Sequence, residues 1–289
     1  MRIKSQSAME YLMTYGWAIL IMATVIAALY ELGVFSIKGP AASPGSCQVN
    51  RPDGPGTADF ISLTGPCTGQ MPQYVAQFSG SSTSNVLIPP SVYLRPNSIT
   101  ITGWSNLLQA GTDSCYTQNL ANSENTGESM GYALIRGWAT DQDSYISNGI
   151  TWTQAGAAGG VPINTWVFQA VTYSTFTGNE ILYYGNGTLT DNVHVYGTLV
   201  TSTSQPVLIG GGCKPGELAD IQIYNTALSQ NDIIALYQEG IGGAPINLQH
   251  LVGWWPLNGN ANDYSGNGND GAASNLIYIQ NWQTGYTAP

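Results

Sequence analysis

An uninterrupted apolar run near the N-terminus is the first feature of the chain. Residues 11–30 carry no charged side chain, and a helix of that length spans roughly 30 Å, about one bilayer core. Arg2 and Lys4 precede the run, and basic residues there favour a cytoplasmic N-terminus. The pattern predicts a single long N-terminal hydrophobic α-helix over residues 6–37, which would anchor the chain in a membrane.

The pattern changes twice after the apolar run. Residues 38–73 are rich in Pro, Gly and Ser, which is typical of a linker or collar. Beyond residue 74 short segments alternate apolar and polar positions and are separated by turn residues. In the segment LADIQIYN the alternation directs Ile221 and Ile223 inward. We therefore predict a mainly β fold, a β-sandwich head over residues 74–289.

Two local signals punctuate the head. Asn186-Gly187 between two alternating runs predicts a hairpin with a type I′ turn. One helix is expected after Ser229, which would act as N-cap, with Asp232 three residues further on and Gly240 as the end.

Composition narrows the function classes. Charged residues make up 8% of the chain and the net charge is −10, so no basic stripe is available for nucleic acid, and we expect no nucleic-acid partner. The 43% of hydrophobic residues is enough to fill a core, which argues against a disordered acidic chain. Abundant Gly, Tyr and Trp with few Lys and Glu favour an extracellular β protein.

The N-terminal residues KSQSAMEYL, followed by the apolar run, resemble the class III signal peptides of archaeal type IV pilin-like proteins. The resemblance covers residues 1 to about 35. It implies that a prepilin peptidase removes the leader 1–5 by cutting between Ser5 and Gln6, and that Glu10 is kept for assembly. Glu10 would pair with the new amine of Gln6, its own or a neighbour's. The alternative is an ordinary anchor whose Glu10 lies in the headgroup layer.

The head has a resemblance of its own. The segments SITITGW, NTWVFQAVTY, ILYYGNGTL and LADIQIYNTALSQNDIIALY, with GWWPLNGNANDYSGNGNDG near the end, resemble the laminin-G-like, concanavalin A-like jelly-roll superfamily. The last segment usually opens such a domain, and here it closes it. The head is therefore circularly permuted, or the segment is a truncated second copy, or it is donated to a neighbouring subunit. We favour permutation within the chain.

Cysteines and histidines indicate structure rather than chemistry. With only two histidines, His194 and His250, and no Cys-x-x-Cys pair, we expect no zinc site. Four cysteines outside a membrane predict two disulfides, and three connectivities are open. Proximity in the sequence favours the pairs Cys47–Cys67 and Cys115–Cys213.

Candidate binding residues fall into three groups. Trp104, Trp166 and Trp254 alternate into strands and are expected in the core, whereas Trp152 and Trp282 are expected as exposed loop aromatics that could stack on a sugar. Oxygen ligands suited to Ca²⁺ are offered by Asp220, Asp263, Asn267, Asn269 and Asp270, with Asn-Gly turns that bond their own backbone as the alternative. Asn186 opens the only N-x-[ST] sequon and is a glycosylation candidate, unless it serves only the turn.

Together these features predict a surface protein without catalytic activity. The closest carboxylate pair, Asp141 and Asp143, lies in a polar loop, and no catalytic motif occurs. We expect a precursor in the membrane that becomes the subunit of an archaeal type IV pilus-like filament with an adhesive head. Its partners would be other copies of itself, the prepilin peptidase, the pilus assembly machinery and surface glycans. No cofactor is required, although Ca²⁺ would fit. The alternative is a membrane-anchored, carbohydrate-binding surface protein that does not polymerise.

Overall fold

The structure is a computed structural model of the whole chain. It describes residues 21–24, 48–50, 62–64, 71–109, 118–123, 130–136, 141–157, 163–176 and 178–289. The chain divides into two units, residues 1–42 and 43–289, which are described separately.

The predicted long N-terminal helix requires a correction. Among the described residues only 21–24 of the apolar run are present, and they are helical, with Thr24 Oγ1 donating to Ile21 O at 2.9 Å. No helix in the described ranges is long and apolar enough to cross a membrane. An apolar run sets the length of a helix only where lipid or other helices cover all of its faces. Ile21 and Met22 are 56% and 63% exposed in this single chain. The remaining residues of 6–37 lie outside the described part.

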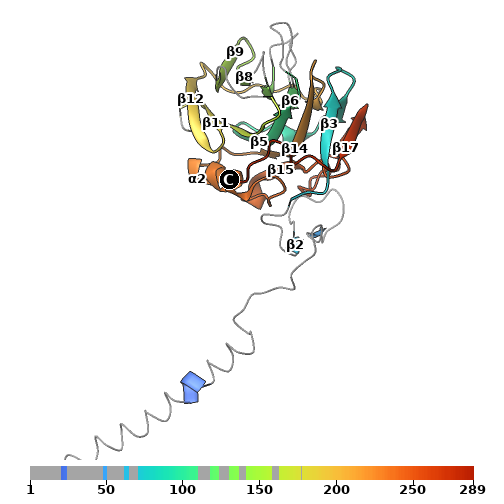
Figure 1. Cartoon of the computed structure of the whole chain (residues 1–289). Helices are drawn as coiled ribbons and strands as arrows, with labels where there is room; N and C mark the ends of the chain where they lie inside the picture. The colour runs from blue at the N-terminus through green and yellow to red at the C-terminus, as the bar shows by residue number, and fades with distance from the viewer. Residues whose placement is uncertain are drawn as a thin grey trace, which may run out of the picture. The chain divides into compact units, whose positions relative to one another are not determined.

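The head is a β-sandwich, as predicted (Figure 1). Its eight-stranded sheet has, in spatial order, β12 (Thr188–His194), β11 (Glu180–Gly185), β10 (Trp166–Ser174), β5 (Ile99–Leu107), β14 (Pro215–Tyr224), β3 (Val75–Ser79) and β17 (Leu276–Ile279), and β15 (Leu251–Trp255) also pairs with β14. The seven-stranded sheet has β16 (Ala272–Ser274), β4 (Asn85–Ile88), β13 (Val207–Gly210), β6 (Gln118–Asn122), β7 (Tyr132–Arg136), β8 (Gln142–Ser147) and β9 (Trp152–Ala157). Strands β1 (Gln48–Asn50) and β2 (Ser62–Thr64) form a separate pair, and η1 (Val92–Leu94) and η2 (Leu248–His250) are 3-10 turns.

The main core fills the space between the two large sheets. Ile221 and Ile223 are fully buried there, together with Ile99 and Ile101 of the neighbouring strand β5, which confirms the direction read from the alternation. All the strand pairs of the two large sheets are antiparallel, so a period of two suffices to separate inner from outer residues.

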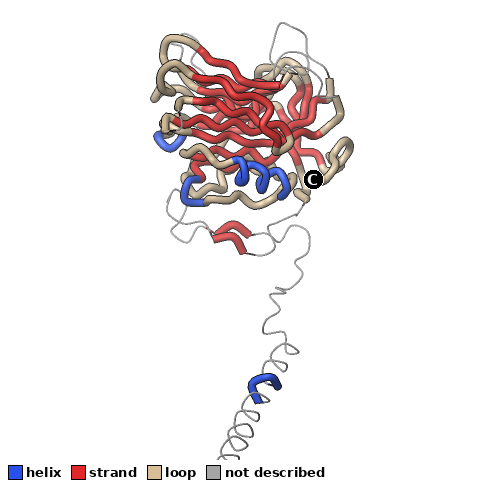
Figure 2. The backbone as a smooth tube through the Cα atoms, turned by 90° about the vertical axis from the view of Figure 1, so that its left-hand side faces the viewer, coloured by secondary structure: helices blue, strands red, loops and turns tan. Residues whose placement is uncertain are grey.

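A second core covers the outer face of the eight-stranded sheet. Helix α2 (Gln230–Glu239) begins after Ser229, whose side chain accepts from the Asp232 N–H in a full capping box, and it ends at Gly240 as predicted. Figure 2 shows the helical segments in blue beside the red strands of the head. The apolar side of the helix, with Ile233 and Leu236, packs in this cluster. The three tryptophans that were expected in the core are buried, but in this second core.

The C-terminal segment completes the head of its own chain. Strand β15 pairs with β14, β16 with β4 and β17 with β3. Figure 1 shows β17 beside β3, although about two hundred residues separate them in the sequence. Asn275, with φ 51°, lies between β16 and β17, where the chain passes from one large sheet to the other. In this chain the segment thus pairs with strands of its own head, and a circular permutation of the domain stays a prediction.

Candidate functional site

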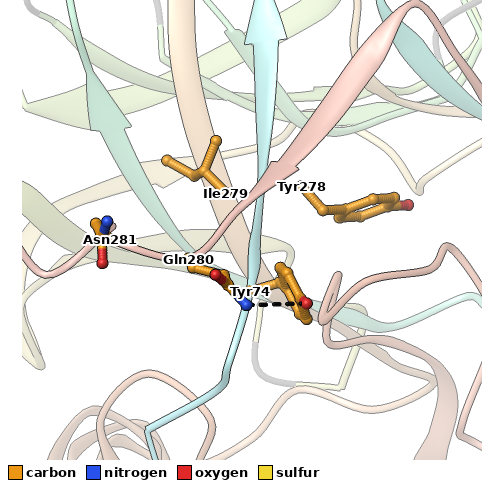
Figure 3. A pocket seen from close by; sticks show the side chains of 5 residues that line it. All are labelled: Tyr74, Tyr278, Ile279, Gln280 and Asn281. Atoms are coloured by element: carbon orange, nitrogen blue, oxygen red, sulfur yellow. Dashed lines mark hydrogen bonds between the residues drawn. The ribbon is translucent and has the colours of Figure 1, made fainter.

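An open hollow of about 560 Å³ lies where the C-terminal end of β17 meets the beginning of β3 (Figure 3). Five residues line it: Tyr74, Tyr278, Ile279, Gln280 and Asn281. Two aromatic rings and two carboxamides thus face one space, and none of the lining side chains is an acid or a base.

Strand pairing brings these residues together. Ile279 is opposite Val75 in the β17–β3 register, so Gln280, one residue after β17, reaches Tyr74, one residue before β3. The Gln280 Nε2 donates to the Tyr74 hydroxyl at 3.0 Å, as the dashed line in Figure 3 shows. The Tyr74 backbone N–H donates to Asn258 Oδ1 at 2.9 Å. Both ends of Tyr74 are therefore fixed by the C-terminal segment.

Tyr278 lines the hollow, but its hydroxyl points away from the other lining side chains (Figure 3). Its oxygen is buried and has no hydrogen-bond partner among the described residues. Burial raises the pKa of this phenol above its ordinary value, so the group is a neutral donor and acceptor at physiological pH. Tyr278 packs against the main core, and an oxygen without exposed surface is out of reach of a ligand in the open hollow. This hydroxyl therefore offers no hydrogen bond to such a ligand.

Trp282 directly follows the lining residue Asn281 in the sequence and is not an exposed ligand aromatic. Its side chain is 1% exposed, and its indole N–H donates to Pro72 O at 3.0 Å. The Trp166 indole donates in turn to Trp282 O at 3.0 Å, and the two rings meet edge to face at 5.6 Å. The expectation of an exposed Trp282 is wrong because the C-terminal segment packs onto the second core instead of leaving the domain.

Trp152 is placed elsewhere. It begins strand β9 instead of occupying a loop, and it is half-buried. In the β8–β9 register it is two residues from Gln154, whose Nε2 donates to Asp143 Oδ1 at 2.7 Å. Desolvation raises the pKa of Asp143. This strand face combines an aromatic ring, an amide and a carboxylate, and it forms a second polar surface separate from the hollow's lining.

The calcium candidates of the C-terminal loop bond their own chain. The Asp263 carboxylate is fully buried and accepts four hydrogen bonds, from the N–H groups of Trp254, Ser265 and Asn269 and from the Ser265 hydroxyl, at 2.8–3.0 Å. A carboxylate has about four acceptor positions, so none is left for a cation. Asp270 Oδ1 accepts the Asp263 N–H at 2.8 Å.

The two asparagines of that set are used in the same way. Asn267 Nδ2 donates to Leu251 O at 3.1 Å, and Asn269 Nδ2 donates to Val252 O at 2.8 Å. In the part of the chain that the structure describes, no three His, Cys, Asp or Glu side chains gather as a metal site would require. The loop therefore matches the alternative, a series of turns that bond their own backbone.

Asp220 belongs to a different network. It lies at φ 51° in the bulge of β14, and its carboxylate accepts from the indole N–H of Trp254 at 2.8 Å and from Gln222 Nε2 at 3.0 Å. Desolvation by full burial raises its pKa to about 6, against the opposing effect of these two donors.

Asn186 forms the predicted hairpin, with φ 47° followed by 75° at Gly187. Its Oδ1 accepts the N–H of Phe168 at 3.0 Å, and a Cβ at Gly187 would lie 3.0 Å from the ring of Tyr237 on α2. The tip is thus packed against the head while Asn186 itself stays exposed, and its glycosylation remains a prediction.

The remaining predicted residues are only partly covered. Cys213 is disulfide-bonded, whereas Cys47, Cys67 and Cys115 lie outside the described residues, so the pairing stays a prediction. Ser5, Gln6 and Glu10 also lie outside them.

The hollow itself escaped the sequence analysis. The segment Tyr278-Ile-Gln280-Asn281 combines one aromatic residue with two consecutive amides, a weak signal that could have suggested a binding edge. Tyr74 gave no signal, because only the pairing of β17 with β3 brings it there.

Comparison with known families supports the architecture. The family model described as the concanavalin A-like lectin/glucanases superfamily matches residues 79–234, a little more than half of the chain. The chain belongs to the concanavalin A-like lectin/glucanases superfamily. The model does not extend to residues 1–35, so the pilin resemblance stays a prediction. A search of curated proteins finds no match.

The chain is similar to several solved structures at low sequence identity. The SAP-like pentraxin from Limulus polyphemus is 13% identical, with a TM-score of 0.50, over 73% of this chain and 97% of the pentraxin. The binding domain of Paraclostridial Mosquitocidal Protein 1 is 12% identical, with a TM-score of 0.48, over 69% of this chain. A structure of botulinum neurotoxin type C, whose cell entry is dependent upon interaction with two ganglioside molecules, is 16% identical, with a TM-score of 0.40, over 49% of this chain. The matches span 47% and 35% of the two toxin chains.

Proposed function

We propose that the head is a non-catalytic carbohydrate-binding domain displayed at the cell surface, with the hollow at β3 and β17 as its binding site. The observation that carries the proposal is the open hollow lined by two tyrosines and the carboxamides of Gln280 and Asn281, with no acid or base among its lining side chains. Sugar rings offer C–H faces to aromatic side chains and hydroxyls to amides, which is the chemistry of this lining. Membership of a superfamily named for lectins supports the same class of function.

Asn281→Ala tests the site with little disturbance of the fold. The Asn281 side chain is exposed at the hollow, so its removal should leave the melting temperature unchanged. Loss of one ligand hydrogen bond should weaken glycan binding about tenfold. Binding is measured on an array of immobilised glycans and then by calorimetry with the glycans that bind.

Trp152→Ala is the matched control, because it alters the other aromatic-polar surface and leaves the hollow intact. It should bind as the wild type does. If Trp152→Ala abolishes binding and Asn281→Ala does not, the site lies on β8–β9 and the assignment to the hollow is wrong.

A second candidate function concerns the N-terminal motif. The register of Ser5, Gln6 and Glu10 supports processing by a prepilin peptidase and a role as a filament subunit carrying the glycan-binding head. N-terminal sequencing of the mature protein tests this proposal. We expect mature chains that begin at Gln6, recovered from sheared surface fibres, whereas an intact Met1 in the membrane fraction would exclude the processing.

A further inference from the structure

We infer that the hollow binds a neutral glycan and discriminates against sugars that carry a carboxylate. The inference rests on the proposed function and names the ligand class of the same site. It depends on which charges the head can bring to the hollow.

The lining itself offers no charge to an acidic sugar. Its polar groups are the Tyr74 hydroxyl and the carboxamides of Gln280 and Asn281, whereas the Tyr278 hydroxyl is buried. These groups donate and accept hydrogen bonds equally, which suits sugar hydroxyls. A carboxylate is acceptor-only, and proteins usually hold it with a charge-assisted bond from Arg or Lys.

The cations of the head are engaged elsewhere. Residues 74–289 contain three Lys or Arg side chains: Arg95, Arg136 and Lys214. Arg95 donates to the carbonyl oxygens of Leu94 and Gln205 and to the Ser123 hydroxyl. Arg136 is 0% exposed on β7 of the opposite sheet.

Lys214 lies at the far end of β3. Its backbone packs against Gly80, just after the strand, whereas Tyr74 lies just before it. Six residues of extended chain separate the two positions by roughly 20 Å. This distance exceeds the reach of a lysine side chain, and it is more than about two Debye lengths at physiological salt. Lys214 therefore cannot neutralise a carboxylate in the hollow.

The overall charge acts in the same direction. With a net charge of −10, the chain repels anionic ligands, and this repulsion weakens as the salt concentration rises. Selection for neutral sugars thus has a local cause in the lining and a long-range cause in the acidic surface.

The test uses pairs of sugars that differ in one group. The probes are short oligosaccharides of glucose, galactose or mannose, each compared with its counterpart oxidised to the uronic acid at the terminal CH₂OH. Calorimetry with the full-length protein should show at least tenfold tighter binding of the neutral member of the pair that binds. A wild type that prefers the uronic acid overturns the inference and leaves the proposed function standing, whereas binding of neither member overturns both.

Asn281→Lys locates the discrimination. Asn281 is exposed at the hollow, so the new ammonium needs no repacking, and Asn281→Gln serves as the neutral control. The lysine variant should reduce the preference for the neutral sugar at least fivefold, and the glutamine variant should keep it. An unchanged preference in the lysine variant would place the bound sugar outside the hollow and contradict the inference.

Discussion

Asp263→Asn is expected to destabilise the head by about 3 kcal/mol, with or without calcium. The carboxylate accepts four hydrogen bonds and is fully buried. An amide of the same shape keeps one oxygen, but its NH₂ group would face two of the four donors. In either orientation of the amide, two of the four donors lose their acceptor. Because the site is buried, water cannot replace it. Chemical unfolding of the variant and the wild type, in EDTA and in millimolar CaCl₂, measures the effect.

Asp270→Asn is the control in the same loop. Asp270 is exposed and uses one oxygen to accept the Asp263 N–H, which an asparagine oxygen would also do. We expect its stability to stay within about 0.5 kcal/mol of the wild type. A calcium site made of these side chains would behave differently: calcium would raise the unfolding midpoint of the wild type, and both variants would lose the increase.

Local patterns were sufficient to predict several elements of the head. The capping box of Ser229 and Asp232 forms within four residues, and the inward direction of Ile221 and Ile223 follows from the pleat of one strand. The Asn186-Gly187 turn is likewise decided by two residues that tolerate positive φ. Each of these features depends on neighbours in the sequence, so the residues themselves carry the information.

The hollow and the place of Trp282 depend on distant pairing. Trp282 was expected at the surface because its own segment looks like a loop, yet its indole bonds Pro72, 210 positions away. Tyr74 meets Gln280 only because β17 adds to the edge of β3. No periodicity in one segment reports which strand will be its neighbour.

The long N-terminal helix was inferred from the apolar run. Hydrophobicity indicates which surroundings a segment needs, such as lipid or other helices, and does not by itself determine the structure of the isolated chain. For the tryptophans of the head, too, the sequence predicted burial but not the elements that cover the side chains. Trp104 and Trp254 were correctly assigned to a core, but alternation could not show that α2 adds a second core on the outer face of the sheet. Burial was predictable, and the layer in which it occurs was not.

Asp220→Asn should make the head less sensitive to pH between about pH 4 and pH 6. The pKa of Asp220 is raised from 3.8 to about 6 by burial, so the folded state keeps a proton that the unfolded state releases. The stability contributed by the neutral carboxyl is therefore complete below about pH 4 and is lost as the pH rises through this interval. The loss amounts to about 3 kcal/mol, because each pKa unit corresponds to about 1.4 kcal/mol.

The asparagine variant keeps the geometry without the titration. Asparagine tolerates the left-handed φ of 51°, and its oxygen can accept from the Trp254 indole. If the Gln222 amide turns over, its oxygen accepts from the new amide nitrogen and its nitrogen faces the Tyr224 hydroxyl, which can accept. The free energy of unfolding of the variant, relative to that of the wild type, should thus increase by about 3 kcal/mol between pH 4 and pH 7.

Differences between the two proteins isolate this effect, because burial also raises the pKa of Asp143 and Glu217 in both of them. Urea unfolding at intervals from pH 4 to pH 7.5 gives the two curves. Trp254→Phe provides a second reading: it removes a donor that stabilises the anion, so the interval in which stability is lost should extend above pH 6. Parallel curves for the wild type and Asp220→Asn would show that Asp220 is ionised in the folded head at pH 4, and that the indole and amide donors outweigh the cost of burying its charge.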